Sequence, residues 1–335
     1  MYKVTCLRPK SDFDNYQVRI PSQIEVTFCT DYDNKTLARA CDNSDIIVAA
    51  SFYPRIDKKL IENCRHLKLI QLTGAGFDTV DLEAAKQKGV WVANVPGANA
   101  KAVAEYTFLV AGMFQRLLLP SISWVMKGEY ESSRAAILQQ GQWEFEGRTF
   151  GIVGMGRIGI EVAKIAHFFG AKVLYHDLHR LPPDREGELA AVKVELGYLL
   201  EAADIIAIHL PLNEHTRGLI GINELKKMKK TAFLINVGRG GIVDENAIIT
   251  ALESGIIAGA ALDTFVMEPL PNDHILVTSS RNGREKLLLT PHIAGGSVQS
   301  FQRMFSAAWD NVLRVARGDS PLNCITRLEI CDRHE

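Results

Sequence analysis

A glycine-rich turn between an apolar run and a helical pattern constrains the fold of this chain more than any other feature. Residues Gly154–Gly159 read GMGRIG and directly follow the apolar run Phe150–Val153. In a βαβ unit the first glycine allows a tight turn, the second lets a ligand approach the backbone, and the third lets the helix pack against the strand. The motif therefore predicts an α/β fold with a doubly wound parallel sheet and a phosphate-binding turn.

The sequence around this turn strengthens the prediction, which would be weak alone because 26 of the 335 residues are glycine. Ala163 and Ala166 allow the following helix to lie close to a sheet. Asp177 follows Gly159 by 18 positions and ends the run Lys172–His176. An acidic side chain there accepts the ribose hydroxyls of NAD and repels the additional phosphate of NADP. We expect the NAD ribose and phosphates to bind at Gly154, Gly156, Arg157, Ile158, Gly159 and Asp177.

Three side chains beside this acid leave the choice of cofactor partly open. His176, His179 and Arg180 flank Asp177, and a guanidinium at this place accommodates a 2′-phosphate. NAD is the predicted cofactor, and NADP remains open as a secondary one.

Short apolar runs alternate with helical patterns along most of the chain, which indicates βαβ units and two similar doubly wound halves. In the first half we expect strands at Ile24–Phe28, Ile46–Ala50, Leu67–Leu72 and Val90–Ala93, with helices at Lys58–Asn63 and Leu82–Lys88. In the second half we expect strands at Thr149–Val153, Lys172–His176, Ile205–Leu210, Phe233–Val237, Gly259–Leu262 and Leu287–Thr290. Two longer helices are predicted: Ala102–Leu119, which is apolar on nearly every face and so buried, and a final helix capped by Ser297. The polar stretch Asn272–Lys286 is interpreted as a loop insertion.

Composition argues against several classes of protein. Hydrophobic residues at 47% and charged residues at 23% are typical of globular proteins, and 335 residues suit two domains. A net charge of −1, with scattered Lys and Arg, argues against nucleic-acid binding. The six cysteines have no metal-ligand spacing and favour reduced thiols in a cytoplasmic protein. The N-terminus does not have the pattern of a signal peptide, and the most apolar helix is too polar and too short to span a membrane.

Three side chains downstream of the glycine turn have the chemistry for hydride exchange between a nicotinamide and a 2-oxo acid. They are Arg239 in NVGRGG, Glu268 in FVMEP and His292 in LTPHI. An Arg stays charged and binds a carboxylate through two parallel hydrogen bonds. An imidazole transfers a proton near neutral pH, and a carboxylate beside it favours the protonated form. Each residue alone has an ordinary structural explanation, but their order after the turn favours catalysis.

With these motifs, the chain from about Asp45 to Asn323 resembles the D-isomer-specific 2-hydroxyacid dehydrogenases, a family with phosphoglycerate, glycerate, D-lactate and formate dehydrogenases. The resemblance implies two Rossmann-like domains. The substrate domain would be flavodoxin-like and discontinuous, at 1–100 plus 294–335, around an NAD-binding domain at 101–293. The two long helices would cross between these domains.

The resemblance also implies a role for each residue of the site. Arg239 would bind the substrate carboxylate and carbonyl oxygen, His292 would exchange a proton with the C2 oxygen, and Glu268 would favour the protonated imidazole. The cofactor site would extend to Pro211 and Thr216 on the adenine and pyrophosphate side, Asp263 at the nicotinamide carboxamide, and Val237.

A glycine-flanked loop in the first half resembles the family segment whose backbone amides bind the substrate carboxylate. It contains Gly74, Ala75 and Gly76, and amides without side chains around them form an anion-binding nest. Phe52 and Tyr53 are expected at the far end of the substrate, where they would accept an apolar side group or merely close the domain edge. Glyoxylate, hydroxypyruvate, pyruvate and longer 2-oxo acids remain open as substrates.

The predicted function is an NAD-dependent interconversion of a small D-2-hydroxy acid and its 2-oxo acid. One alternative is an NAD(H)-sensing interaction protein of the co-repressor type on the same fold. Another is a formate- or phosphite-type dehydrogenase, although Ala75 stands where phosphite dehydrogenases carry Lys. No catalytic metal is expected, because no histidine has metal-ligand spacing; His66, His274 and His334 are interpreted as exposed.

Oligomeric state is the last expectation from the sequence. The apolar helix Ala102–Leu119 and the segment Trp124–Tyr130 have more apolar surface than one domain can easily cover. This surplus predicts a homodimer.

Overall fold

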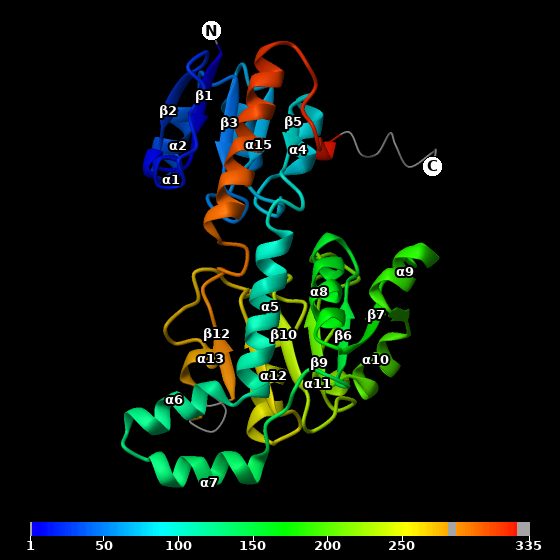
Figure 1. The fold of residues 1–335 in the computed structure, drawn as a ribbon. Helices are drawn as coiled ribbons and strands as arrows, with labels where there is room; N and C mark the ends of the chain where they lie inside the picture. The colour runs from blue at the N-terminus through cyan, green and yellow to red at the C-terminus, as the bar shows by residue number, and fades with distance from the viewer. Residues whose placement is uncertain (1, 281–285, 327–335) are drawn as a thin grey trace. The chain divides into compact units, whose positions relative to one another are not determined.

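The computed structural model describes residues 2–280 and 286–326, and the chain divides into two compact units. One unit combines the residues up to Asn99 with those from Gly296 onward, and the other is Ala100–Gly295. Each unit is built around one parallel sheet with helices on both faces (Figure 1). The predicted α/β class with two doubly wound sheets is confirmed.

The first unit contains a five-stranded sheet in the order β2-β1-β3-β4-β5, which is the order of flavodoxin-like folds. Its strands are β1 (Lys3–Cys6), β2 (Glu25–Phe28), β3 (Ile46–Ala49), β4 (Leu69–Leu72) and β5 (Trp91–Ala93). Every residue of β3 and β4 is buried, because helices cover both faces of this parallel sheet.

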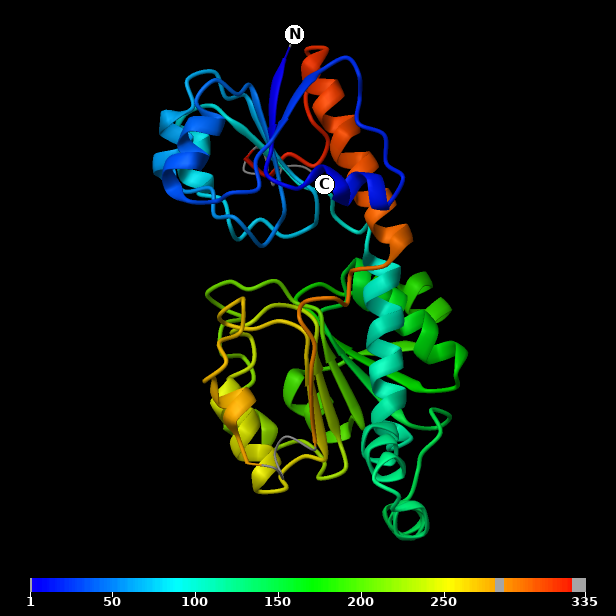
Figure 2. The same cartoon turned by 90° about the vertical axis from the view of Figure 1, so that its left-hand side faces the viewer.

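The helices of this unit are α1 (Lys10–Asn15), α2 (Asn34–Cys41), α3 (Lys58–Asn63), α4 (Leu82–Gln87) and α15 (Val298–Ala316). One face of the sheet is covered by α2, α3 and α4, and the other by α1 and α15 (Figure 2). Both faces are therefore closed by helices, as a doubly wound fold requires.

Helix α15 brings the last part of the chain back to this unit. Its start is capped as predicted: Ser297 Oγ accepts from Ser300 N at 3.1 Å, and Ser300 Oγ accepts from Ser297 N at 3.0 Å. Phe305 and Trp309 stand four residues apart on its buried stripe, and their ring centroids lie 4.9 and 5.3 Å from that of Phe13 in α1. Aromatic packing thus joins the two ends of the sequence in one core.

The second unit contains a seven-stranded sheet in the order β12-β11-β10-β9-β6-β7-β8. Its strands are β6 (Thr149–Val153), β7 (Lys172–His176), β8 (Ala191–Lys193), β9 (Ile205–Ile208), β10 (Phe233–Asn236), β11 (Gly259–Leu262) and β12 (Leu287–Leu289). The strand order reverses at β6, which lies between β7 and β9. Ligands of open α/β sheets bind outside the carboxyl ends of the strands at such a point.

The helices of the second unit are α5 (Ala100–Gln115), α6 (Leu118–Met126), α7 (Tyr130–Gln140), α8 (Arg157–Phe168), α9 (Pro183–Leu189), α10 (Leu196–Ala202), α11 (Ile222–Leu225), α12 (Glu245–Glu253) and α13 (Ile275–Thr278). One face of the sheet packs on α5 and α8, and the other on α10, α11, α12 and α13. Contact on the second face is close, since a Cβ atom at Gly151 of β6 would lie 2.7 Å from Leu199 Cδ2 of α10.

The prediction of one helix over Ala102–Leu119 is wrong. The chain leaves α5 at Gln115 and starts α6 at Leu118, because Leu117 has a left-handed φ of 50°. Helix α5 is mostly buried, as predicted, whereas no residue of α6 is buried. In the described ranges no single helix is long and apolar enough to cross a membrane, and α5 with α6 passes that test only as a pair bent by 60°.

Some short elements also differ from the predictions. The stretch Asn272–Lys286 contains α13 rather than loop alone, and its residues 281–285 lie outside the described part of the chain. Strand β8 and helix α7 were not predicted, since the first has only three residues and the second is polar and weakly periodic. The five described cysteines are free, and Cys331 lies outside the described ranges.

Candidate active site

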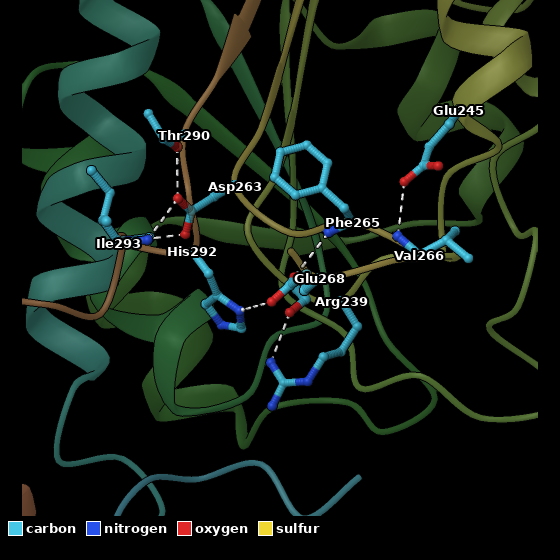
Figure 3. A network of polar contacts seen from close by, with 11 residues as sticks. Arg239, Glu245, Asp263, Phe265, Val266, Glu268, Thr290, His292 and Ile293 are labelled. Carbon is cyan, nitrogen blue, oxygen red and sulfur yellow. Dashed lines mark hydrogen bonds and ion pairs between the residues drawn. The ribbon is translucent and has the colours of Figure 1, made fainter. Parts of the chain in front are cut away.

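The three predicted catalytic residues follow three neighbouring strands of the seven-stranded sheet. Arg239 follows β10, Glu268 lies in the segment after β11, and His292 follows β12. Because β10, β11 and β12 are adjacent and parallel, their carboxyl ends lie at one edge of the sheet. Figure 3 shows the three side chains gathered at that edge.

His292 and Glu268 form a hydrogen-bonded pair. His292 Nδ1 lies 2.8 Å from Glu268 Oε2, and Glu268 Oε1 accepts from the backbone N–H of Phe265 at 3.0 Å. Burial raises the pKa of Glu268, but the hydrogen bond and charge of His292, the Phe265 amide and the charge of Arg239 lower it below the ordinary value of 4.5. The carboxylate is therefore ionised at neutral pH and keeps a proton on Nδ1, and an imidazole held in this way can exchange a proton through Nε2.

Arg239 is oriented by its own turn. Asn236 Nδ2 donates to Arg239 O at 3.0 Å, while Asn236 Oδ1 accepts from Gly238 N at 3.1 Å. The guanidinium Nη1 donates to Gly238 O at 2.8 Å. A cation held in this way beside an imidazole can bind an acid group while a proton is transferred next to it.

Asp263 holds the backbone that carries His292. Its Oδ1 accepts from Thr290 Oγ1 at 2.6 Å and from Ile293 N at 2.9 Å, and its Oδ2 accepts from Ala294 N at 2.8 Å. His292 has a φ of 53°, in the left-handed region that residues other than glycine rarely adopt. Burial raises the pKa of Asp263 although these hydrogen bonds oppose it. The carboxylate expected at the nicotinamide carboxamide thus also shapes the His292 turn, and its contact with a carboxamide stays a prediction.

Gly240 joins the Arg239 turn to the segment that carries Glu268. A Cβ atom at Gly240 would lie 1.9 Å from both C and O of Phe265 and 2.4 Å from Val266 N. The two backbones are in direct contact here, which only glycine permits. Main-chain packing therefore sets the separation between the cation and the carboxylate.

The glycine turn after β6 has the geometry that a dinucleotide requires. Gly154 has a φ of +100°, and a Cβ atom at Gly159 would lie 2.3 Å from Gly154 O. A Cβ atom at Gly156 would meet nothing within 4 Å, so the backbone there is open to a ligand. No side chain caps the start of α8, whose first amides are the donors that a phosphate accepts from.

Asp177 reaches the same turn from the end of β7. Its Oδ2 accepts from Met155 N at 2.7 Å and its Oδ1 accepts from His179 N at 3.0 Å. Arg180, the candidate for a 2′-phosphate, is bound to Glu186 instead, through Nε to Oε1 at 3.1 Å and Nη2 to Oε2 at 2.9 Å. The residues present fit NAD, and the Arg180–Glu186 pair favours NAD over NADP.

The remaining cofactor candidates lie at the ends of β9 and β10. Pro211 and Thr216 share one turn, in which Thr216 Oγ1 donates to Pro211 O at 2.7 Å and accepts from Asn213 N at 2.8 Å. Val237 is buried against the α5 and α8 side of the sheet. The ring nitrogens of His209 are shielded and have no partner, and burial lowers its pKa to about 3, so this imidazole is neutral.

The loop expected to bind the substrate carboxylate follows β4 in the first unit. Its carbonyl groups are held by neighbouring chain: Gly74 O accepts from Val95 N at 2.9 Å, and Ala75 O accepts from Asn94 Nδ2 at 2.6 Å. Gly74 and Ala75 are half-buried, and Gly76 is buried. These two carbonyl groups are therefore engaged within the protein, and anion binding by the amides of this loop stays a prediction.

Phe52 and Tyr53 follow β3 at the same edge of that sheet. Their side chains are 59% and 53% exposed, and the ring of Tyr53 contacts that of Tyr32 edge-on at 5.1 Å between centroids. A Cβ atom at Gly74 would lie 2.7 Å from Ser51 Oγ, so the two loops are in contact. Neither aromatic residue is part of the core.

Two polar residues near the site were missed by sequence reasoning. Glu245 Oε1 accepts from Val266 N at 2.9 Å, and its Oε2 lies 3.3 Å from His274 Nε2. The interpretation of His274 as exposed is wrong, because its side chain is only 23% exposed and is paired. His66 is exposed, and His334 lies outside the described residues. Over residues 2–280 and 286–326, no three or more His, Cys, Asp or Glu side chains form a group that could hold a metal ion.

Comparisons with known proteins agree with this geometry. The family model described as "D-isomer specific 2-hydroxyacid dehydrogenase, NAD binding domain" matches residues 110–294. The chain is 40% identical over 276 residues to a glyoxylate reductase of Aeropyrum pernix, which is 82% of this chain and 80% of the relative. It is 36% identical over 276 residues to a glyoxylate reductase of Thermococcus litoralis, with 82% and 81% covered.

A solved structure extends the likeness to the whole fold. The D-lactate dehydrogenase from Aquifex aeolicus, complexed with NAD and lactic acid, superposes with a TM-score of 0.81 at 26% sequence identity. The superposition covers 95% of this chain and 96% of that enzyme. Both units of the present chain therefore have counterparts in that structure.

Proposed function

We propose how this chain, which belongs to the D-isomer-specific 2-hydroxyacid dehydrogenase family, carries out its reaction. As a member of the family it is an NAD-dependent oxidoreductase that interconverts a 2-hydroxy acid and its 2-oxo acid. The observation that carries the proposal is the cluster of Arg239, Glu268 and His292 at one sheet edge, with His292 Nδ1 2.8 Å from Glu268 Oε2. These three side chains are the catalytic residues of the proposal.

In the direction of reduction, Arg239 binds the carboxylate and carbonyl oxygen of the 2-oxo acid with its planar guanidinium. Protonated His292 donates its Nε2 proton to the carbonyl oxygen, while Glu268 stabilises the imidazolium through Nδ1. When bound, the nicotinamide would supply the hydride for C2 in this direction and would accept it from C2 in the reverse direction. In the direction of oxidation, neutral Nε2 of His292 accepts the hydroxyl proton, and Arg239 keeps the acid group in place.

We assign cofactor binding to residues 101–293 and substrate binding to 1–100 plus 294–335. The glycine turn, the carboxylate of Asp177 and the open backbone at Gly156 support the first assignment. Residues Arg157, Ile158, Pro211, Thr216, Val237 and Asp263 complete the proposed cofactor site. The pairing of Arg180 with Glu186 supports NAD as the main cofactor, with NADP used less efficiently.

We propose glyoxylate and other small 2-oxo acids as substrates. The names of the relatives from Aeropyrum pernix and Thermococcus litoralis support glyoxylate. The amides of Gly74, Ala75 and Gly76 bind the acid group, and Phe52 and Tyr53 limit the size of the group on C2. Exposure of both rings supports this role, because no core packing accounts for them.

We also propose that the chain forms a homodimer in the cytoplasm. In Figure 1, α6 and α7 extend from the lower end of α5, and no residue of α6 is buried. Their apolar side chains Ile122, Val125, Met126, Tyr130 and Leu138 are exposed. A second copy of this surface would cover them, and the five free cysteines favour a reducing compartment. A monomer in sedimentation at micromolar concentration would contradict the dimer.

The test is oxidation of NADH, followed at 340 nm, with glyoxylate, hydroxypyruvate, pyruvate, phenylpyruvate and 2-oxoisocaproate, each repeated with NADPH. We expect turnover with the smaller acids and a preference for NADH. Activity with the bulky acids alone would overturn the proposed pocket. If no acid of the panel is reduced although NADH still binds, the alternatives of a nucleotide-sensing protein or of a dehydrogenase for an unusual acid substrate are favoured.

A further inference from the structure

Glu245 is a buried carboxylate outside the catalytic cluster. It is the first residue of α12, yet it does not cap that helix, since the side chain of Asp244 accepts from Asn246 N and Ala247 N. Only 9% of its side chain is exposed, so the carboxylate needs partners to offset its desolvation. It finds them in the segment that follows β11: Oε1 accepts from Val266 N at 2.9 Å (Figure 3).

The second partner of this carboxylate is His274, in a fixed tautomer. His274 Nδ1 accepts from Leu276 N at 3.3 Å, at the start of α13. A nitrogen that accepts carries no proton, so the ring proton is on Nε2, which lies 3.3 Å from Glu245 Oε2. The carboxylate therefore bridges the start of α12 to two points, 266 and 274, on either side of Glu268.

Apolar packing holds the segment between these two points at Leu270, which is partly buried against the same core cluster as Phe265, and not at Val266 or Met267. The side chains of Val266 and Met267 are 63% and 59% exposed, although Phe265 is buried. Between Phe265 and Glu268 the main chain is in contact with three groups: Glu245 accepts from Val266 N, Glu268 accepts from Phe265 N, and Gly240 lies against the Phe265–Val266 peptide. The peptide between Phe265 and Val266 is thus held by the Arg239 turn and by Glu245 at once.

We propose that Glu245, with His274 as its partner, is a positioning residue that holds the 265–268 segment so that Glu268 meets His292. The inference rests on the proposed roles of Glu268 and His292. Glu245 is placed to act through the Val266 amide, and the proposal gives it no direct contact with the His292 imidazole or with the reacting atoms. Loss of this amide contact loosens Glu268 and weakens its support of the imidazolium that donates the proton in reduction.

The experiment compares Glu245→Ala, Glu245→Gln and His274→Asn. The first removes both contacts. In the second, one amide oxygen still accepts from Val266 N, but the amide NH2 meets the Nε2–H of His274. In the third, Asn still accepts from Leu276 N but does not reach Glu245. We therefore expect the largest effect from Glu245→Ala and smaller, similar effects from the other two.

The measured quantities are kcat, the pH dependence of glyoxylate reduction, and the Kd of NADH by fluorescence. We expect Glu245→Ala to lower kcat about 10- to 100-fold and to leave the Kd of NADH unchanged. The alkaline limb of the profile should move to lower pH, because the imidazolium loses support. Among the described residues, the charges of Glu268 and Asp263 act on His292, and that of Arg239 acts on Glu268; these variants alter none of the three.

Asp244→Ala is the matched control, because it weakens the start of α12 without touching Val266. It should lower the melting temperature and leave the pH profile in place. If it moves the profile as far as Glu245→Ala does, the effect is general to the helix end and the proposal is overturned. A loss of stability without any change in kcat or profile for Glu245→Ala would also overturn it.

Glu268→Gln separates this inference from the proposed function beneath it. If Glu268→Gln shifts the profile and Glu245→Ala does not, only the positioning role fails. If Glu268→Gln leaves the pH profile and kcat unchanged, the proposed role of Glu268 is wrong, and the positioning role of Glu245, which depends on it, is wrong as well.

Discussion

The carboxyl-end edges of the two sheets differ in how their functional candidates are held. At the edge of the seven-stranded sheet the candidates are charged and are hydrogen-bonded to one another or to backbone. Examples are the His292–Glu268 pair and Asp263, which accepts from the Ile293 amide. At the edge of the five-stranded sheet they are the uncharged Phe52 and Tyr53 and a loop of backbone amides. Under the proposed roles, we expect chemistry to depend on a network of side chains that tolerates little change, and substrate selection to depend on shape and to tolerate more.

The largest effect should come from His292→Ala at the charged edge. Removal of the proton donor should lower kcat about 100- to 10,000-fold, while the Kd of NADH, measured by fluorescence, stays within error. His66→Ala, at an exposed position of the first unit, is the matched control and should keep full activity. Turnover of His292→Ala near that of the unmodified chain would remove this residue from the mechanism.

Arg239→Lys should follow in size. Lys keeps the charge but not the planar pair of donors, so kcat/KM for glyoxylate should fall about 10- to 100-fold, which corresponds to the loss of one charge-assisted hydrogen bond. The Kd of NADH should not change. Kinetics close to those of the unmodified chain would show that a point charge suffices at this position.

Gly240→Ala tests the backbone contact at the same edge. Its Cβ would lie 1.9 Å from Phe265 backbone atoms, and overpacking of this kind costs about 1–3 kcal/mol, or a fall in melting temperature of about 2–12 °C. Gly187→Ala in α9 is the control, because its Cβ would meet nothing within 4 Å and should keep or raise the melting temperature. Equal melting temperatures for the two variants would contradict the contact.

At the uncharged edge, Phe52→Ala and Tyr53→Ala should change selection rather than rate. We expect the ratio of kcat/KM for phenylpyruvate over glyoxylate to rise about 10-fold, with kcat for glyoxylate nearly constant. If either variant loses as much glyoxylate turnover as His292→Ala does, the proposal that this edge selects the substrate without taking part in the chemistry is contradicted.

The smallest effect concerns pH and stability. The pKa of Glu268 is lowered in the folded chain, so the folded state binds this proton less readily than the unfolded chain does. Its contribution to the free energy of unfolding is complete above pH 4.5 and is lost as the pH falls through the lowered value. Urea unfolding should show Glu268→Gln as less stable than the unmodified chain at pH 7, with a difference that vanishes in acid. A constant difference at all pH values would contradict the ionic pairing.

Much of the charged edge was predictable, because its parts stand in short motifs beside strands. Asp177 was predicted from its distance to the glycine turn, and Arg239, Glu268 and His292 from their motifs and their order after that turn. The class of fold followed from the alternation of apolar runs and helical patterns. Local patterns of this kind are what a single sequence records well.

What could not be predicted depends on tertiary contacts or on unusual backbone. The break at Leu117 and the turn at His292 both need a positive φ at a residue other than glycine, and nothing in the sequence signals it. Glu245 meets a backbone amide 21 positions away, in a segment with no periodic pattern, and so resembled an ordinary acid at a helix start. The prediction that His274 is exposed was wrong for the same reason, because its partner Glu245 is distant in sequence.

The contact of Gly240 with the Phe265–Val266 peptide has a consequence for engineering. The turn that carries Arg239 could not be transplanted into another scaffold alone, because it packs against another stretch of main chain. The Arg239 turn and the 265–268 segment would have to be transferred together, with glycine kept at position 240 where the two main chains meet. For the same reason, a substitution library around Arg239 should contain more folded variants if the 265–268 segment is varied together with it.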